Sequence, residues 1–154
     1  MFRLAKEVWN EQTAETTEKD RYQNIIFFPI GEPNPYVQFF TGQSYLAPLS
    51  DKQVPVYNVT FEPACRNNWY IHHSDNVGGQ MLICVGRRGY YQEWGKAAEE
   101  LVPGTVINIP ANVRHWHDAA PNSWFSHLAI EVQGENASAE WCEPVSDEDC
   151  GKLK

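Results

Sequence analysis

The residues with the clearest chemical potential are the five histidines, which fall into two regions of the chain. One region has two adjacent histidines followed by a Gly-Gly-Gln sequence, and the other has a His-Trp-His sequence with a further histidine ten residues on. Neither region alone supplies enough ligands for a metal ion. A fold that joins them would gather several imidazoles and an amide oxygen, a set that suits Zn, Mn, Fe or Ni. The residues are His72, His73 and Gln80 in the first region, and His115, His117 and His127 in the second.

The elements that must position these residues read as short β-strands. Runs of β-favouring residues follow one another closely, and Pro- and Gly-containing turn signals separate them. This pattern predicts an all-β sandwich or barrel rather than alternating strands and helices. The expected strands cover residues 25–28, 36–40, 44–46, 54–61, 69–73, 80–85, 89–94, 105–109, 113–117 and 124–132.

Strand geometry decides which side chains of the first region share a face. Successive side chains alternate between the two faces, so Tyr70 and His72 point to one side and His73 to the other. Glycines at 78–79 permit an unusual turn and a close backbone approach just before Gln80. That turn would let the Gln80 amide reach back towards His72.

The same alternation places His115 and His117 on one face of their strand and Trp116 on the other. His127 lies in a run that is apolar on both faces, which is typical of a central, buried strand. A histidine in such a strand must be hydrogen-bonded, bind a metal or carry a proton.

Composition defines the organisation and excludes several classes of function. The 154 residues form one domain, whose six Trp, seven Tyr and seven Phe favour a β-rich interior with a lined cavity. We expect a polar N-terminal arm at 1–24, a barrel at 25–135 and an acidic C-terminal tail at 136–154. The tail packs on the barrel and contains one short helix, because Ser146 begins a capping-box-like sequence.

The net charge of −8 and the absence of a basic cluster argue against a nucleic-acid partner. No apolar run is long enough to span a membrane, and no secretory signal is visible, so a cytoplasmic location is expected. Four free thiols are then the default for the cysteines, although Cys142 and Cys150 could pair.

The sequence resembles the small single-domain cupins. It is most similar to the bacterial group associated with carboxymuconolactone decarboxylases and to the cupin-type hydroxynitrile lyases. The resemblance covers nearly half of the chain and depends on two motifs in their proper order. The matching segments are 59–63, 69–72, 79–80, 101–106, 109–110, 114–117 and 126–130, with a further similar strand at 36–49.

The resemblance implies a jelly-roll barrel, or double-stranded β-helix, that holds one divalent transition metal. Carried over to this chain, His72, Gln80 and His115 are metal ligands. Tyr70 stands where these cupins have another histidine, and the segment before Gln80 is longer than their usual spacer. The positions of His117 and His127 line the pocket in the hydroxynitrile lyase-like members and are implicated there in proton transfer.

Tyr70 leaves two interpretations open. A divalent metal can lower the pKa of a phenol enough for a phenolate to bind, which makes Tyr70 a metal ligand. Alternatively, Tyr70 fills the space of the missing imidazole and leaves His72, Gln80 and His115 as a weak site.

The resulting hypothesis is a metal-dependent cupin enzyme with a lyase- or isomerase-like step at a carbonyl or hydroxyl carbon of a small substrate. His127 or His117 would move the proton, and Trp69 and Trp116 would contact the substrate. Oxygen-dependent chemistry at iron remains open. The alternative is a non-enzymatic small-molecule-binding cupin with a weakened or absent metal site; a protein-interaction role is a third reading.

A homodimer is expected because pairing would cover edge strands and aromatic surface in the N-terminal half.

Overall fold

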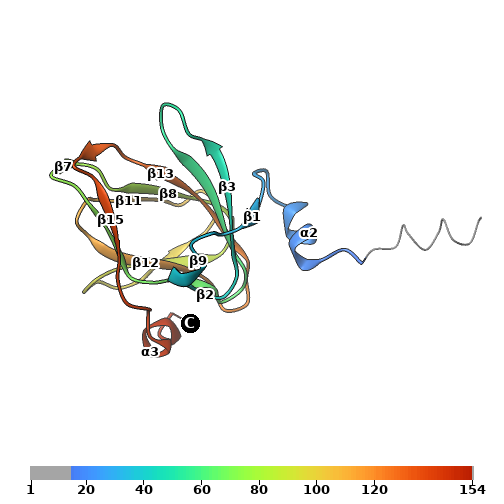
Figure 1. The fold of residues 1–154 in the computed structure, drawn as a ribbon. Helices are drawn as coiled ribbons and strands as arrows, with labels where there is room; N and C mark the ends of the chain where they lie inside the picture. The colour runs from blue at the N-terminus through green and yellow to red at the C-terminus, as the bar shows by residue number, and fades with distance from the viewer. Residues whose placement is uncertain (1–14, 154) are drawn as a thin grey trace, which may run out of the picture.

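The computed structural model describes residues 15–153, and in it two antiparallel sheets face each other across a common interior (Figure 1). The first sheet has six strands in the order β1-β3-β4-β13-β8-β11. Their bounds are Glu32–Pro33 (β1), Ser44–Ser50 (β3), Val56–Phe61 (β4), Phe125–Glu131 (β13), Gln80–Arg87 (β8) and Val106–Ile109 (β11).

The second sheet has seven strands and carries most of the candidate residues. Its main path is β10-β9-β12-β5-β2, and β6 pairs with both β12 and β15. The bounds are Glu99–Leu101 (β10), Gly89–Glu93 (β9), Arg114–Ala119 (β12), Arg66–Asn67 (β5), Phe40–Thr41 (β2), Tyr70–His73 (β6) and Ser138–Trp141 (β15). A separate two-stranded ribbon pairs β7 (Asn76–Val77) with β14 (Gly134–Glu135). This arrangement confirms the predicted all-β jelly-roll barrel.

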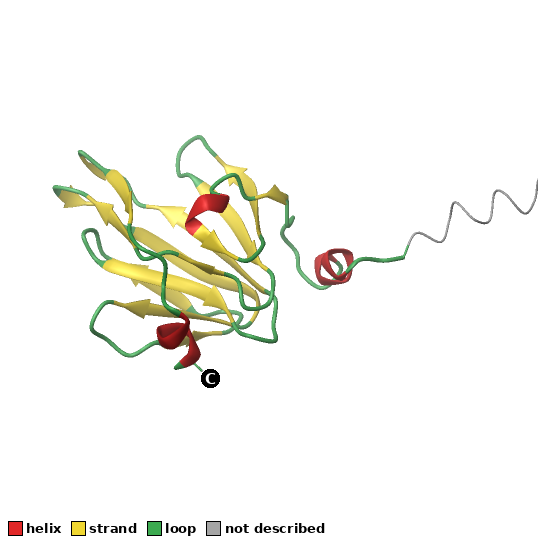
Figure 2. Cartoon of the chain, turned by 60° about the horizontal axis from the view of Figure 1, so that its bottom comes forward, coloured by secondary structure: helices red, strands yellow, loops and turns green. Residues whose placement is uncertain are grey.

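In the part of the chain that the structure describes, the helices are short and lie outside the sheets (Figure 2). These are α2 (Glu18–Gln23), the 3₁₀ turn η1 (Val37–Phe39) and α3 (Asp147–Gly151). The Ser146 side chain accepts a hydrogen bond from the Asp149 backbone N–H and caps α3, which confirms the predicted C-terminal helix. No helix within residues 15–153 is both long and apolar enough to cross a membrane.

The apolar core lies between the sheets and follows from alternation along the central strands. In β4, Val59 and Phe61 face inwards, and in β13 Phe125 and Ala129 do the same. Ser126 points to the opposite face, where its hydroxyl oxygen accepts a hydrogen bond from the buried Tyr22 hydroxyl of α2. The core fills one part of the barrel interior and leaves a cavity in the remainder, on the side where His127 faces inwards.

Two expected strands are wrong, both in the N-terminal half. Residues 25–28 form no strand, and most of 36–40 is the η1 turn. Prolines at 29, 33 and 35 interrupt this region, and a proline has no N–H to give to a sheet ladder. The side chains of Ile25 and Phe27 consequently point into solvent.

The chain ends also differ from the expected domain limits. Residues 1–14 of the expected arm lie outside the described residues, while α2 is fixed to the barrel through Tyr22. The C-terminal tail enters the barrel itself, because β15 pairs with β6 along its whole length. The barrel therefore extends beyond the predicted limit at residue 135. All four cysteines lie within the described residues as free thiols.

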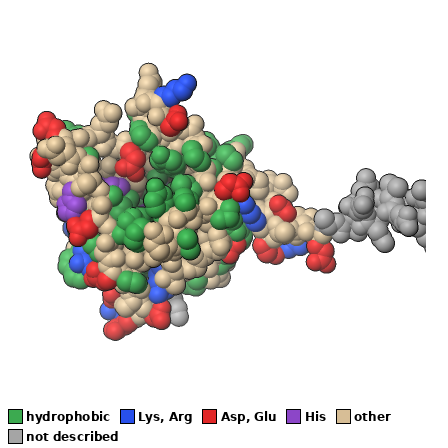
Figure 3. All heavy atoms as spheres, viewed as in Figure 1, with side chains coloured by type: hydrophobic (Ala, Val, Ile, Leu, Met, Phe, Trp, Pro, Cys, Tyr) green, Lys and Arg blue, Asp and Glu red, His purple; other side chains and the backbone are tan. Residues whose placement is uncertain are grey.

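We expect the protein to be a homodimer in solution. Hydrophobic side chains gather over the centre of the face seen in Figure 3, and Ile25, Phe27 and Val37 are among the exposed apolar residues. Pairing would remove such a surface from water. Light scattering at micromolar concentration should give the mass of two chains. Phe27→Ser should weaken the dimer, whereas the control Val102→Ser, at an exposed position just after β10, should not; a clean monomer in the unaltered protein would remove the claim.

Candidate active site

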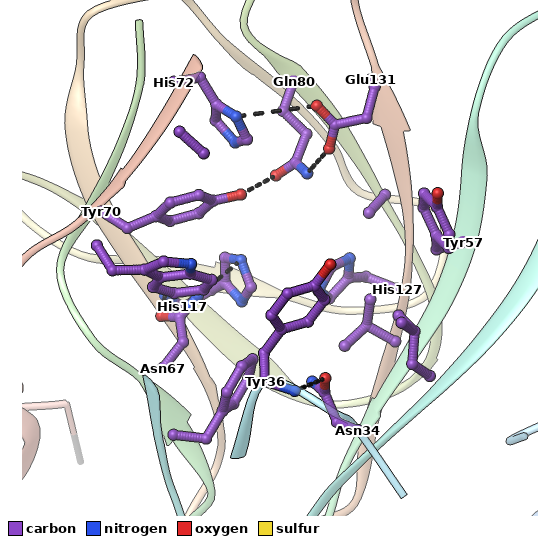
Figure 4. A pocket seen from close by; sticks show the side chains of 16 residues that line it. Asn34, Tyr36, Tyr57, Asn67, Tyr70, His72, Gln80, His117, His127 and Glu131 are labelled. Carbon is purple, nitrogen blue, oxygen red and sulfur yellow. Dashed lines mark hydrogen bonds and ion pairs between the residues drawn. The ribbon is translucent and has the colours of Figure 1, made fainter. Parts of the chain in front are cut away.

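A cavity of about 350 Å³ opens into the barrel between the two sheets, and it brings both histidine regions together (Figure 4). Aromatic and aliphatic side chains form much of its wall, and polar groups converge from β6, β8, β12 and β13. The polar lining residues include Asn67, Tyr70, His72, Gln80, His117, His127 and Glu131. His115 lies directly behind this wall, with its ring centre 4.7 Å from that of Tyr70.

The turn at residues 78–79, which the two glycines led us to expect, brings Gln80 into the cavity. Gly78 and Gly79 both have positive φ, and a side chain at Gly79 would collide with the Ile109 carbonyl oxygen. Gln80 then donates from Nε2 to Glu131 at 2.7 Å, while its Oε1 accepts from the Tyr70 hydroxyl at 3.5 Å. Figure 4 shows this chain of contacts across the cavity.

The histidines of the two candidate metal-binding strands each leave one ring nitrogen without a partner. The Nδ1 atom of His115 lies 3.0 Å from the Val113 carbonyl oxygen. A carbonyl oxygen only accepts, so Nδ1 carries the proton and Nε2 carries the lone pair. His72 Nδ1 lies 3.8 Å from a Glu131 oxygen, and the Nε2 atoms of both histidines are buried without a hydrogen-bond partner.

This donor chemistry fits a divalent transition metal. Histidines that bind metals typically give their other ring N–H to a carboxylate or a backbone carbonyl, as Glu131 and Val113 are placed to accept here. Gln80 Oε1 provides a third donor of a type that such metals accept. Within residues 15–153, however, no three His, Cys, Asp or Glu side chains gather closely enough to hold a metal by themselves. The candidate ligand set therefore consists of two imidazoles and one amide oxygen.

Tyr70 occupies the position between the two candidate imidazoles. Its ring centre lies 4.4 Å from that of His72 and 4.7 Å from that of His115. Burial raises the pKa of the Tyr70 phenol far above its usual value, and the Glu131 carboxylate adds to the rise. The hydroxyl is therefore protonated unless a bound cation displaces the proton.

His117 and His127 form a second imidazole pair deeper in the cavity. Their ring centres are 4.7 Å apart in a T-shaped arrangement. His127 is almost completely buried, and neither of its ring nitrogens has a hydrogen-bond partner. It sits at a register shift between β13 and β8, an irregularity that often re-aims a side chain near an active site.

Burial keeps all four inward-facing imidazoles neutral near pH 7. Desolvation lowers the pKa of His115 and His127 to about 4, and it lowers the pKa of His117 well below its usual value. It also lowers the pKa of His72, although the Glu131 carboxylate opposes the change. Neutral imidazoles retain the lone pairs needed to bind a metal or take a proton.

The structure corrects the expectation that Trp69 and Trp116 contact a substrate in this cavity. Both pack into a separate cluster with Val145, against the side chains of the C-terminal segment. Alternation explains the position of Trp116, since the neighbouring His115 and His117 take the inner face. His73 likewise points outwards, as predicted, and its Nε2 contacts Glu140 at 2.5 Å.

The sequence reasoning missed three cavity residues that contact the predicted site residues. Trp141 of β15 stacks on Tyr70 with 4.4 Å between ring centres. Glu131 lies opposite Gln80 in the register of β13 and β8. Asn67 contacts His117 from β5. Alternation from His127 through Ala129 could have placed Glu131 on the inner face, but the other two depend on long-range pairing.

Comparisons with known proteins support the fold described above. No model of a known protein family matches the chain. The chain is 37% identical over 114 residues to the (R)-mandelonitrile lyase of Granulicella tundricola, a match that covers 71% of this chain and 84% of that protein. It is also 37% identical to a cupin-like protein from Thermotoga maritima, with a TM-score of 0.73 over 82% of this chain and 95% of that one. The DMSP lyase from Ruegeria pomeroyi shares the fold, at 11% identity and a TM-score of 0.54 over 91% of this chain and 77% of that one.

The buried state of His127 predicts an acid-sensitive stability. Its pKa is about 4 when folded and near 6.5 when exposed, so the unfolded chain binds more protons between these values. Stability should therefore fall as the pH drops through this window, by roughly 2 kcal/mol at pH 5 for this one group. Urea unfolding at pH 7 and pH 5 measures the loss. Between pH 7 and pH 5, His127→Gln should lose about 2 kcal/mol less of its unfolding free energy than the unaltered protein. The exposed-site control His73→Gln should lose as much as the unaltered protein. Equal losses in all three would contradict the assignment.

Proposed function

The chain belongs to the cupins, and we propose that it is a metal-dependent lyase that cleaves a carbon–carbon bond next to a hydroxyl or carbonyl carbon of a small neutral substrate. The observation that carries this proposal is the set of buried imidazole nitrogens without partners on His72, His115, His117 and His127. Buried polar atoms are nearly always hydrogen-bonded. Several unpartnered nitrogens around one cavity therefore support ligands and proton carriers rather than core residues.

The charge of the cavity wall supports a neutral substrate. None of the described residues that line the cavity is Lys or Arg, and Glu131 is the one carboxylate among them. The imidazoles are neutral near pH 7 because burial lowers each pKa. A carboxylate or phosphate group would find no cationic side chain on this wall. Phe40, Trp141 and Val59 instead offer apolar surface.

The relatives support the type of step. A mandelonitrile is a neutral hydroxynitrile with an aromatic ring, and a protein named for its cleavage is more than a third identical to this chain. Such a molecule combines an apolar ring with a hydroxyl on the carbon whose carbon–carbon bond breaks. The cavity of this chain has an apolar wall for the ring and imidazoles for the hydroxyl.

The proposed metal site consists of His72, His115 and Gln80, with Tyr70 at its side. When bound there, a divalent transition metal would supply Lewis-acid polarisation of a substrate oxygen. Glu131 and the Val113 carbonyl would hold the two imidazoles in the tautomers that present Nε2. The aromatic and aliphatic part of the cavity wall would limit the access of water to the reacting carbon.

The proton steps fall to the deeper imidazole pair. A neutral imidazole of His127 takes the proton of the substrate hydroxyl while the oxygen forms a carbonyl double bond. The electron pair of the adjacent carbon–carbon bond leaves with the departing carbon, and the imidazolium returns the proton to that carbon. The products are one carbonyl compound and one protonated leaving group, and the enzyme regains its initial state.

A non-enzymatic binding protein is the second candidate, because Tyr70 fills the space between His72 and His115. A phenol that is protonated and held by Gln80 offers a metal less than an imidazole would. Metal content of the purified protein separates the two candidates. A stoichiometric metal that is lost in His72→Ala supports the enzyme, and a metal-free protein that still binds small neutral ligands supports the alternative.

The roles assigned to the histidines predict different losses in two alanine variants. His115→Ala should lower both metal content and turnover of mandelonitrile, because it removes a ligand. His127→Ala should keep the metal and lower kcat by about 100-fold or more, the usual contribution of a general base. Metal analysis and steady-state kinetics give both quantities, with the surface variant His73→Ala as control. Equal metal loss in the two variants would make His127 a ligand instead of a base.

Tyr70→His should strengthen metal binding. The new imidazole would complete a set of three nitrogens and one amide oxygen, which favours Mn, Ni or Zn. We expect calorimetric affinity to rise by at least about tenfold, or roughly 1.4 kcal/mol. Tyr90→His adds an imidazole on β9 outside the cavity lining and should leave the affinity unchanged.

A flat or lower affinity in Tyr70→His would instead show that Tyr70 already binds as a phenolate. In that case an iron(III) or copper(II) form of the unaltered protein would carry a phenolate-to-metal absorption band, and the variant would lose it. No binding in either protein at millimolar metal would overturn the metal site.

A further inference from the structure

Asn67 holds His117 through two hydrogen bonds that together define the position of a proton. The backbone N–H of His117 donates to Asn67 Oδ1 at 3.0 Å. Only the amide oxygen can accept from an N–H, so this contact fixes which end of the Asn67 amide is oxygen and which is nitrogen. The amide nitrogen Nδ2 therefore faces the imidazole, 3.2 Å from His117 Nε2.

An amide nitrogen is a donor and has no lone pair to accept with, so His117 Nε2 must be the acceptor. In a neutral imidazole the proton then resides on Nδ1. That atom is buried and has no partner within the described protein. Because His117 lines the cavity, its N–H is left for a bound molecule.

The neighbouring His115, two residues earlier on the same face, has the opposite arrangement of partners. There Nδ1 bonds to the Val113 carbonyl, and the bare atom is Nε2. The two imidazoles of one strand thus present different groups: His115 presents a lone pair and His117 presents an N–H. His117 cannot offer Nε2 to a metal while Asn67 occupies it.

Asn67 itself is rigidly placed. It is almost completely buried in β5, where Phe40 of β2 is its partner in register. On the other side, β5 pairs with β12, the strand that carries His117. A second amide follows directly, but Asn68 donates to the Cys142 carbonyl at 3.2 Å and makes no hydrogen bond to an imidazole within residues 15–153.

We propose that Asn67 is a positioning residue that holds His117 in the Nδ1–H tautomer, so that His117 donates a hydrogen bond to the substrate oxygen or leaving group while His127 takes the proton. The substrate then meets one donor and one acceptor, which suits a neutral molecule that carries a hydroxyl beside a second polar atom. The catalytic part of this assignment rests on the proposed lyase function, whereas the tautomer does not. The two can therefore fail separately.

The tautomer is measured directly by two-bond ¹H–¹⁵N spectra of protein labelled with ¹⁵N-histidine. The His117 signals are identified by their loss in His117→Gln. We expect Nδ1 to show the shift of a protonated ring nitrogen and Nε2 that of an unprotonated one. The reverse pattern in the unaltered protein overturns the proposal.

Asn67→Asp tests whether Asn67 sets the tautomer of His117. Its carboxylate can still accept the His117 backbone N–H, but its second oxygen accepts where the amide nitrogen donated. His117 Nε2 should therefore move to the protonated type of shift, and Asn68→Asp, the matched control, should leave His117 unchanged. An unchanged His117 in Asn67→Asp overturns the role of Asn67.

The catalytic consequence is read from kinetics with mandelonitrile as the probe. A wrong tautomer removes the donor without removing the cavity, so Asn67→Asp should lower kcat by about 100-fold and change KM little. A rise in KM at unchanged kcat would contradict the donor role. An unaltered protein that does not cleave mandelonitrile counts against the proposed function, and the spectra still decide the tautomer.

Discussion

Four imidazoles are buried, and each has at least one ring nitrogen without a hydrogen-bond partner. This burial is the constraint on which the rest of the structure depends. Each unpartnered polar atom inside a protein costs about 1–3 kcal/mol. The chain accepts this cost at His72, His117 and His127, which line one cavity, and at His115, which lies directly behind its wall. The two antiparallel sheets and the apolar cluster at the other part of the interior hold the cavity open against collapse.

The imidazoles are differentiated by their outer contacts rather than by their own chemistry. Glu131 and the Val113 carbonyl oxygen are placed to receive the Nδ1 protons of His72 and His115. The Nε2 atoms of both rings are left without a partner, and the two ring centres lie 5.6 Å apart. Asn67 gives His117 the opposite tautomer. His127 is left with neither nitrogen bonded. Under the proposed function, four identical side chains would serve as metal ligands, hydrogen-bond donor and proton acceptor within one small volume.

Much of this could be predicted from the sequence, because period-two alternation is a local rule. It placed Tyr70 with His72, His115 with His117, and Trp116 on the opposite face. The rest depends on strand pairing between distant segments, which no local pattern contains. Trp141 reaches Tyr70 only because β15 pairs with β6, and Asn67 reaches His117 only because β5 pairs with β12. For the same reason, residues 136–154 were expected to form a tail, and Trp69 was expected to contact the substrate.

The central claim, that both histidine regions form one metal site, is tested most directly by anomalous diffraction from crystals supplied with Zn or Mn. We expect a single strong anomalous peak in the cavity, within bonding distance of the Nε2 atoms of His72 and His115 and of Gln80 Oε1. A peak located only at surface groups such as His73 and Glu140, with the buried imidazoles unchanged, would contradict it. The same map would show whether the Tyr70 oxygen joins the ligands or turns away.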